Sequence, residues 1–111
     1  MGVLNWEISD HYPFSEDLFS PENTVQWELL KNSLALETVL TGAVYIKAPF
    51  GVFFDAGVGF PVLLEVIHFG KERAAFPEDY PELSSEISGR LVGFAEGNRQ
   101  LHVVNPTLAQ S

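Results

Sequence analysis

From residue 36 onward, hydrophobic and polar positions alternate with a period of two. The run ETVLTGAVYIKA places Val44 and Ile46 on one face and Tyr45 and Lys47 on the other, as in a half-buried strand. Four later runs, GVFFDAG, PVLLEVIHF, EISGRLVGFA and RQLHVV, are also typical of strands. The pattern therefore predicts five strands.

Turn signals separate these runs. AGVG joins the second and third runs, and GKERAAFPEDYPELSS makes a long connection between the third and the fourth. In that connection Phe76, Tyr80 and Leu83 are expected to close one end of the fold, with a partner-binding loop as the alternative. The turn EGN joins the last two runs, and Gly97 or Asn98 is expected to take a positive φ there.

The first 35 residues lack this alternation and are predicted to form an irregular acidic leader with one short helix. Ser20 can cap the helix, and Pro21 suits its first position, so we expect a helix from about Pro21 to Lys31 that covers a barrel end. The predicted domain organisation is a leader at 1–35, a barrel at 36–104 and a frayed tail at 105–111.

Five strands with one long connection favour a small closed barrel, because closure removes the exposed edges of an open sheet. The predicted fold class is all-β, a five-stranded barrel of the oligonucleotide/oligosaccharide-binding (OB) type. The chain has 111 residues, which suits one such domain.

Charge changes this picture, because 15 acidic and 6 basic side chains give a net charge of −9. Residues 1–38 hold seven acids and one base, so the leader carries most of the excess. Such a chain on average repels phosphate backbones and anionic lipid. No run approaches about 18 apolar residues and the start lacks a signal peptide, so we expect a soluble, cytoplasmic protein without a membrane segment.

Several kinds of chemistry are not expected. The chain has no cysteine, which excludes a disulfide, a thiolate metal site and a thiol nucleophile. The histidines His11, His68 and His102 lack ligand spacing, so no metal or cofactor is expected. No serine lies in a nucleophile elbow. We therefore expect a protein without enzymatic activity.

The stretch APFGVFFDAG carries aromatics that the core does not need. In a strand Phe54 faces the core, while Phe53 shares the wet face with Asp55. Phe50 lies at an odd interval from Phe53, and a bulge at Gly51 would turn both rings outward. Two such rings would form a stacking platform for bases. The alternative is that one or both rings pack beneath the leader.

The region from about Leu36 to Val104 resembles the S1 RNA-binding domain. The blocks that carry the resemblance are TGAV, FGVFFDAG, LLEV and SEISGRLVGF, followed by a turn and RQLHV. The resemblance implies a five-stranded OB-fold (S1-like) barrel and binding of single-stranded RNA.

The resemblance also implies which positions face RNA. The two aromatics that flank the strand glycine are Phe50 and Phe53, and the arginine that enters the fifth strand is Arg99. The histidine position of the third strand holds Glu65, and the aspartate position of the fourth holds Ala95. A carboxylate in place of an imidazole should weaken contact with phosphates.

We therefore expect a weak, largely sequence-tolerant module for single-stranded RNA, in which aromatics stack bases and cations contact phosphates. The expected RNA-facing residues are Phe50, Phe53, Tyr45, Lys47, Arg90, Arg99, His102 and Glu65. The alternative is an acidic protein-interaction module that has lost RNA affinity and binds a basic or apolar partner through the leader or the aromatic face.

Overall fold

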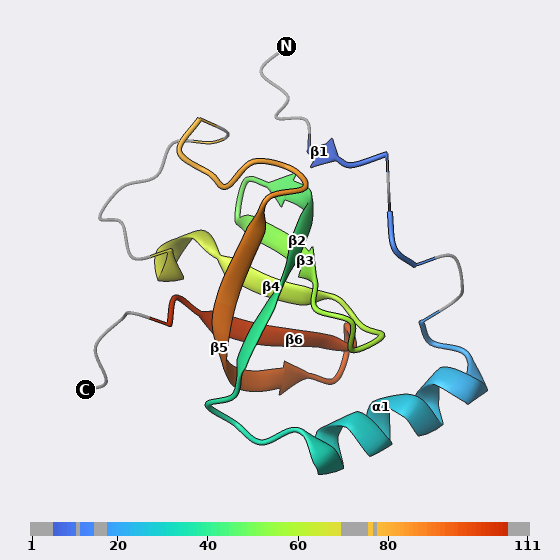
Figure 1. Cartoon of the computed structure of the whole chain (residues 1–111). Helices are drawn as coiled ribbons and strands as arrows, with labels where there is room; N and C mark the ends of the chain where they lie inside the picture. Colours follow the sequence, from blue (N-terminus) through green and yellow to red (C-terminus); the bar gives the residue numbers. More distant parts are fainter. Residues whose placement is uncertain (1–5, 11, 15–17, 70–75, 77, 107–111) are drawn as a thin grey trace.

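The computed structural model describes residues 6–10, 12–14, 18–69, 76 and 78–106. Figure 1 shows strands wound into a barrel, with a helix across one end. The elements are β1 (Glu7–Ile8), α1 (Pro21–Ser33), β2 (Val39–Ala48), β3 (Gly51–Asp55), β4 (Val62–Glu65), the 3-10 helix η1 (Val66–His68), β5 (Glu86–Ala95) and β6 (Gln100–Val104).

The strands β2 to β6 close into a five-stranded barrel. Neighbours β2–β3, β3–β4, β5–β6 and β2–β5 are antiparallel, whereas β4 and β6 run parallel. The strand β2 closes the barrel because its first half pairs with β5 and its second half with β3. This confirms the predicted all-β, five-stranded OB-type barrel. The short strand β1, which pairs with β2 outside the barrel, was not predicted.

Apolar side chains from every barrel strand fill the interior, as expected for alternating inward positions. Phe54 is fully buried among them, as predicted. Other fully buried interior residues are Val44, Val52, Phe60, Val62, Leu91, Leu101 and Val103. Removal of this apolar surface from water stabilises the barrel.

A β-bulge in β2 changes the predicted alternation. Val44 pairs with Phe54 and Ile46 pairs with Phe53, so Tyr45 is the extra residue. Tyr45 and Ile46 therefore both belong to a cluster on the outer face of the barrel. The prediction that Ile46 shares the inner face with Val44 is wrong, because the bulge shifts the alternation by one residue.

The predicted bulge at Gly51 is also wrong. Gly51 pairs in regular register with Ala48 on β2 and with Glu65 on β4. Phe50 instead lies in the two-residue turn between β2 and β3, where strand alternation does not set its direction. Glycine is needed at 51 for another reason, because a Cβ there would lie 2.4 Å from the carbonyl oxygen of Leu64.

The helix α1 confirms the predicted cap and start. Ser20 Oγ accepts a hydrogen bond from the amide of Asn23 at 3.2 Å, and Pro21 is the first helical residue. The helix ends at Ser33, two residues beyond the predicted end. Its Trp27 is buried against the barrel interior, so the helix covers a barrel end as expected.

The long connection between β4 and β5 closes a second part of the barrel, as predicted. Tyr80 is buried and its ring contacts Phe69 and Phe76 edge to face. Its hydroxyl donates to the carbonyl oxygen of Pro49 at 2.5 Å, and burial raises the pKa of Tyr80. Leu83 packs against the same core.

Two local predictions differ from the structure. In the turn between β5 and β6, Arg99 has the positive φ of 50°, whereas neither Gly97 nor Asn98 does. The third predicted strand ends at Glu65, and the chain continues as η1. Residues 107–111 lie outside the described part of the chain, so the predicted domain boundaries stay predictions.

Candidate nucleic-acid-binding groove

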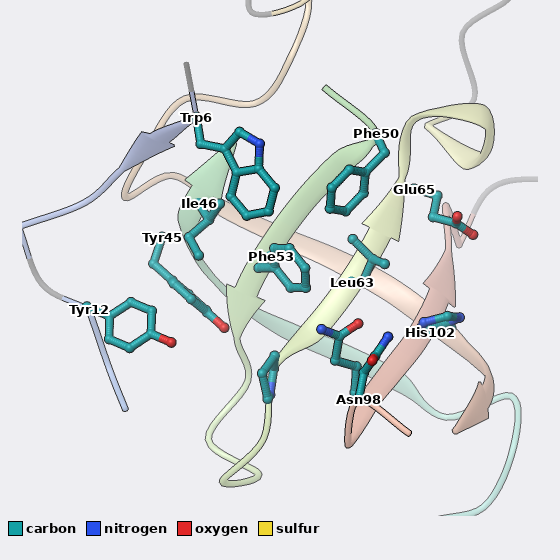
Figure 2. Close-up of a pocket in the computed structure, with 12 residues that line it drawn as sticks. Trp6, Tyr12, Tyr45, Ile46, Phe50, Phe53, Leu63, Glu65, Asn98 and His102 are labelled. Atoms are coloured by element: carbon teal, nitrogen blue, oxygen red, sulfur yellow. The ribbon is translucent and has the colours of Figure 1, made fainter. Parts of the chain in front are cut away.

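A groove of about 470 Å³ lies on the outer face of β2, β3, β4 and β6 (Figure 2). The turn β2–β3 contributes Phe50 and the turn β5–β6 contributes Asn98. These are the face and two of the loops that OB folds use for oligonucleotides. The lining residues are Trp6, Tyr12, Tyr45, Ile46, Phe50, Phe53, Pro61, Leu63, Glu65, Asn98, Gln100 and His102. We call this site the aromatic groove.

A chain of aromatic rings runs along the aromatic groove. Trp6 contacts Phe50 with ring centroids 5.5 Å apart, and Phe50 contacts Phe53 at 6.0 Å. Phe53 in turn lies 6.4 Å from Tyr45, whose other side meets Tyr12 at 5.5 Å. Most of these contacts are edge to face, a favourable geometry for aromatic pairs. Two of the five rings, those of Trp6 and Tyr12, come from the leader.

The prediction of two solvent-exposed stacking rings is wrong for Phe53. Its ring is on the outer face as predicted, but its side chain is only 6% exposed, whereas Phe50 is 41% exposed. Phe53 packs in the outer cluster with Tyr45, Ile46 and Leu63, and Phe14 of the leader covers that cluster. The alternative of packing beneath the leader therefore holds for this ring.

Tyr45 is buried in the same way, so it does not extend an exposed platform. Phe14 and Tyr12 both contact its ring edge to face. The amide of Ser9 donates to the carbonyl oxygen of Tyr45 at 2.8 Å, which ties the leader to the bulge in β2. Burial is the main cause that raises the pKa of the Tyr45 phenol.

The opposite wall of the aromatic groove is polar. Glu65 from the end of β4 and His102 from β6 both line it, together with Gln100 and Asn98. His102 Nε2 is buried and has no hydrogen-bond partner among the described residues. Amide and imidazole groups supply both donors and acceptors, so this wall can pair with the edge of a polar ring.

Lys47 is not at the aromatic groove, contrary to the prediction. It pairs with Val52 across β2 and β3, so its side chain lies on the opposite face from Phe53. The bulge at Tyr45 causes this change of face. The side chain is buried, and its Nζ lies 3.4 Å from a carboxylate oxygen of Glu7 on β1.

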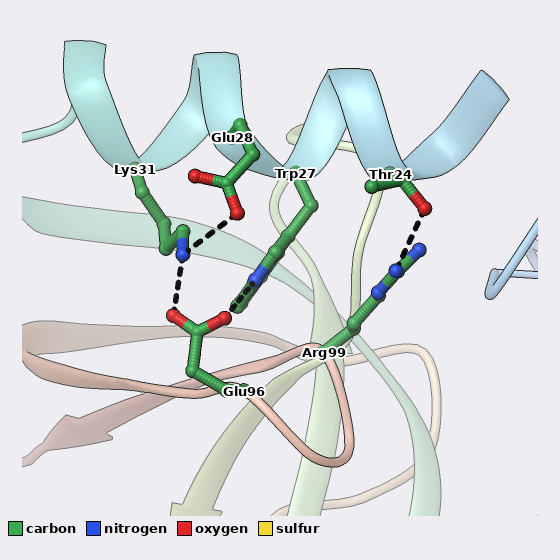
Figure 3. Close-up of polar contacts among 6 residues, drawn as sticks. All are labelled: Thr24, Trp27, Glu28, Lys31, Glu96 and Arg99. Atoms are coloured by element: carbon green, nitrogen blue, oxygen red, sulfur yellow. Dashed lines mark hydrogen bonds and ion pairs between the residues drawn. The ribbon is translucent and has the colours of Figure 1, made fainter. Parts of the chain in front are cut away.

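The two predicted arginines also lie outside the aromatic groove. Arg90 on β5 donates to the Glu37 carboxylate at 2.5 Å. Arg99 donates to the carbonyl oxygen of Leu18 at 2.9 Å. It also donates to Thr24 Oγ1 at 2.8 Å, as Figure 3 shows. Both guanidinium groups hold parts of this chain together, so the predicted set of phosphate contacts is not assembled in this structure.

The helix α1 is held by a second polar contact with the β5–β6 turn. The Glu96 carboxylate accepts from Trp27 Nε1 at 2.9 Å and from Lys31 Nζ at 2.5 Å, as Figure 3 shows. The hydrogen bond from Lys31, and then that from Trp27, lowers the pKa of Glu96. We call Thr24, Trp27, Lys31, Glu96 and Arg99 the helix anchor.

Two features are absent from the described residues. In that part of the chain, no three histidine or acidic side chains gather closely enough to bind a metal ion. The same residues include no helix with the length and apolar character needed to cross a membrane.

The sequence did not indicate several lining residues. Trp6 and Tyr12 were missed because the two-residue strand β1 is too short to show a period. The sequence indicates Asn98 only as a turn residue. One sequence feature could have indicated Trp6 and Tyr12. Both are aromatic residues in a leader that is otherwise rich in acidic residues.

Comparison with solved structures agrees with the barrel. The solution structure of GSP13 from Bacillus subtilis superimposes with a TM-score of 0.57 at 12% sequence identity, over 70% of this chain and 62% of that one. The match thus spans less than two thirds of GSP13. No protein-family model matches the chain, and no curated protein matches it. At this identity the likeness shows the fold alone, an OB-type, S1-like barrel.

Proposed function

We propose that the chain is an S1-like module that binds single-stranded RNA weakly, by stacking a base on Phe50 in the aromatic groove. The observation that carries the proposal is the position of the groove, on the barrel face that OB folds use for oligonucleotides. The resemblance of the barrel to S1 domains supports RNA as the nucleic acid.

The groove has the groups that unstacked bases need. Of the neighbouring rings Phe50 and Phe53, Phe50 is the exposed one. Stacking of a base on such a ring is worth about 1–3 kcal/mol. The side chains of Asn98 and Gln100 can pair with base edges on the other wall. Because every base has an aromatic face, recognition of this kind tolerates many sequences.

Weak affinity follows from the charges. Lys47, Arg90 and Arg99 were expected to contact phosphates, but each contacts a residue of this chain instead. The net charge of −9 also repels a polyanion. We propose a binding role without catalysis, and the expected cytoplasmic location stays a prediction.

The test is an NMR titration of the full chain with a short single-stranded RNA at low salt. Amide shifts should cluster around the β2–β3 turn, β4 and β6, which line the groove. The variant Phe50→Ala should weaken binding by about 1–3 kcal/mol and barely change stability, because the ring is 41% exposed. Phe19→Ala removes another exposed ring, outside the groove, and is the matched control.

A second candidate function is a protein-interaction module. It is favoured by a specific observation, namely that the described residues lining the groove include aromatics and Glu65 but neither lysine nor arginine. A basic or apolar protein segment would suit such a groove and the acidic leader. An unchanged spectrum with millimolar RNA at low salt would decide for this candidate.

A further inference from the structure

We propose that the aromatic groove recognises an uncharged nucleoside unit, a base with its ribose, and leaves the phosphates in solvent. In this proposal Trp6 of the leader forms one wall of the site. The inference rests on the proposed function and narrows its ligand from a polyanion to a neutral heteroaromatic ring.

Charge is the first argument. Among the residues that the structure describes, the groove is lined by one carboxylate, Glu65, and by no lysine or arginine. All four cations in the described part of the chain have acidic or backbone partners elsewhere: Lys31 with Glu96, Lys47 with Glu7, Arg90 with Glu37 and Arg99 with Leu18. A phosphate in the groove would face a carboxylate without a cation to offset it, whereas a neutral base would not.

The shape of the groove is the second argument. Trp6 and Phe50 are 48% and 41% exposed, and their ring planes meet at 76°. Figure 2 shows Trp6 and Phe50 at one end of the site, with Phe53 near its centre. A flat ring can therefore stack on one of the two exposed rings and meet the other with its edge. The volume of about 470 Å³ is within the usual range for small-molecule sites.

The polar wall is the third argument. Asn98, Gln100 and His102 lie across the groove from the exposed rings, as Figure 2 shows for Asn98 and His102. The buried Nε2 of His102 lacks a hydrogen-bond partner within the described structure, which is costly unless a polar group from outside satisfies it. Asparagine and glutamine side chains match the N6 and N7 edge of adenine. Adenosine is thus a suitable probe.

The experiment compares adenosine, adenosine 5′-monophosphate and an eight-residue oligoadenylate on the full chain, at two salt concentrations. We expect adenosine to shift the groove amides and the Trp6 indole N–H signal, whereas the signal of buried Trp27 stays in place. The monophosphate should bind no more tightly than adenosine. The slope of log affinity against log salt for the oligonucleotide should be shallower than about −0.7, the value for one phosphate contact.

Two variants test the wall that Trp6 forms. Trp6→Ala should weaken adenosine binding about 5-fold or more, the equivalent of one lost stacking contact. Trp6→Phe keeps an aromatic ring at the same place and should retain most of the affinity. Thermal unfolding of both variants separates a binding effect from a folding effect.

The outcomes separate this inference from the proposed function. Oligoadenylate binding with a steep salt slope, tighter binding of the monophosphate, or binding of the oligonucleotide without adenosine would overturn the inference and leave RNA binding intact. Adenosine shifts that cluster outside the groove would also overturn it. If none of the three ligands binds, both proposals fail.

Discussion

The leader meets the barrel in two regions that differ in chemistry. At the helix anchor, polar side chains far apart in sequence join α1 to the β5–β6 turn, with Glu96 accepting from both Trp27 and Lys31. At the aromatic groove, the leader contacts the barrel through the rings of Trp6, Tyr12 and Phe14 and through the two residue pairs of β1.

This difference indicates which of the two regions can accept a ligand. The hydrogen bonds of the helix anchor need specific donors and acceptors at fixed positions. Exposed aromatic rings can add a further stacking contact without such partners, and a base supplies the aromatic face for it. Burial agrees with this view, because Trp27 is 1% exposed and Trp6 is 48% exposed. The helix anchor is therefore closed to a ligand, whereas the exposed rings of the groove leave room for one beside them.

The largest expected effect comes from removing the buried ring of the helix anchor. Trp27 packs edge to face against Phe60 and Phe94, so Trp27→Ala should leave a cavity and lower the free energy of unfolding by about 3–5 kcal/mol. Trp6→Ala is the matched change at the groove, and it should lower the free energy of unfolding by only about 0.5–1.5 kcal/mol. Chemical denaturation followed by far-UV circular dichroism measures both. Equal losses in the two variants would remove the distinction between the regions.

A smaller effect is expected from Arg99, for which sequence and structure suggest different roles. Arg99→Gln removes the guanidinium hydrogen bonds to Leu18 and Thr24. The free energy of unfolding should therefore fall by about 1.5–3 kcal/mol. RNA affinity should fall no more than in Arg90→Gln, which loses the same charge elsewhere on the barrel. The measurements are denaturation and RNA titration of both variants.

One outcome would support the predicted contact between Arg99 and RNA. If Arg99→Gln kept its stability but bound RNA far more weakly than Arg90→Gln, the arginine would contact phosphates as its place before β6 suggested. The backbone does not complicate this comparison, because glutamine, like arginine, is an unbranched residue without a special preference for a φ of 50°.

The strands of the barrel could be predicted because their signal is local. Alternation in β2 to β6 and the turn residues between them show in short windows of sequence. The bulge at Tyr45 could not be predicted this way, since it depends on how β2 pairs with β3. That one residue explains two errors, the inner face assigned to Ile46 and the groove position assigned to Lys47.

The site was predicted only in part, because only some of its contacts are local in sequence. Phe53 was placed on the outer face because a local pattern with Asp55 marks that face. Phe50 was placed there through a bulge at Gly51 that the structure does not have. The partners of cations are not local, since Arg99 contacts Leu18 and Lys31 contacts Glu96 across most of the chain. A sequence shows that an arginine is present, but the fold decides whether it is already bound.

The hydrogen bond between Lys31 and Glu96 in the helix anchor is strongest over the range of pH in which both side chains are charged. The pKa of Glu96 is lowered from its ordinary value of 4.5, chiefly by the hydrogen bond from Lys31. The stabilisation from Glu96 is therefore present above the ordinary value and is lost as pH falls through the lowered pKa. The pKa of Lys31 is raised from 10.5, chiefly by Glu96, so its contribution is lost only as pH rises through that higher pKa.

The smallest expected effect is thus a loosening of α1 in acid, while the groove contacts stay in place. As pH falls below 4.5, the ordinary value for Glu96, and through the lowered pKa, the indole N–H signal of Trp27 should shift because its bond to Glu96 weakens. NMR spectra over a pH series measure this. Glu96→Gln keeps an acceptor for the indole without the titrating charge, so its Trp27 signal should not follow that acid transition. If the variant and the unaltered chain shifted at the same pH, another carboxyl group would control the docking of the helix, and the helix anchor would not depend on the charge of Glu96.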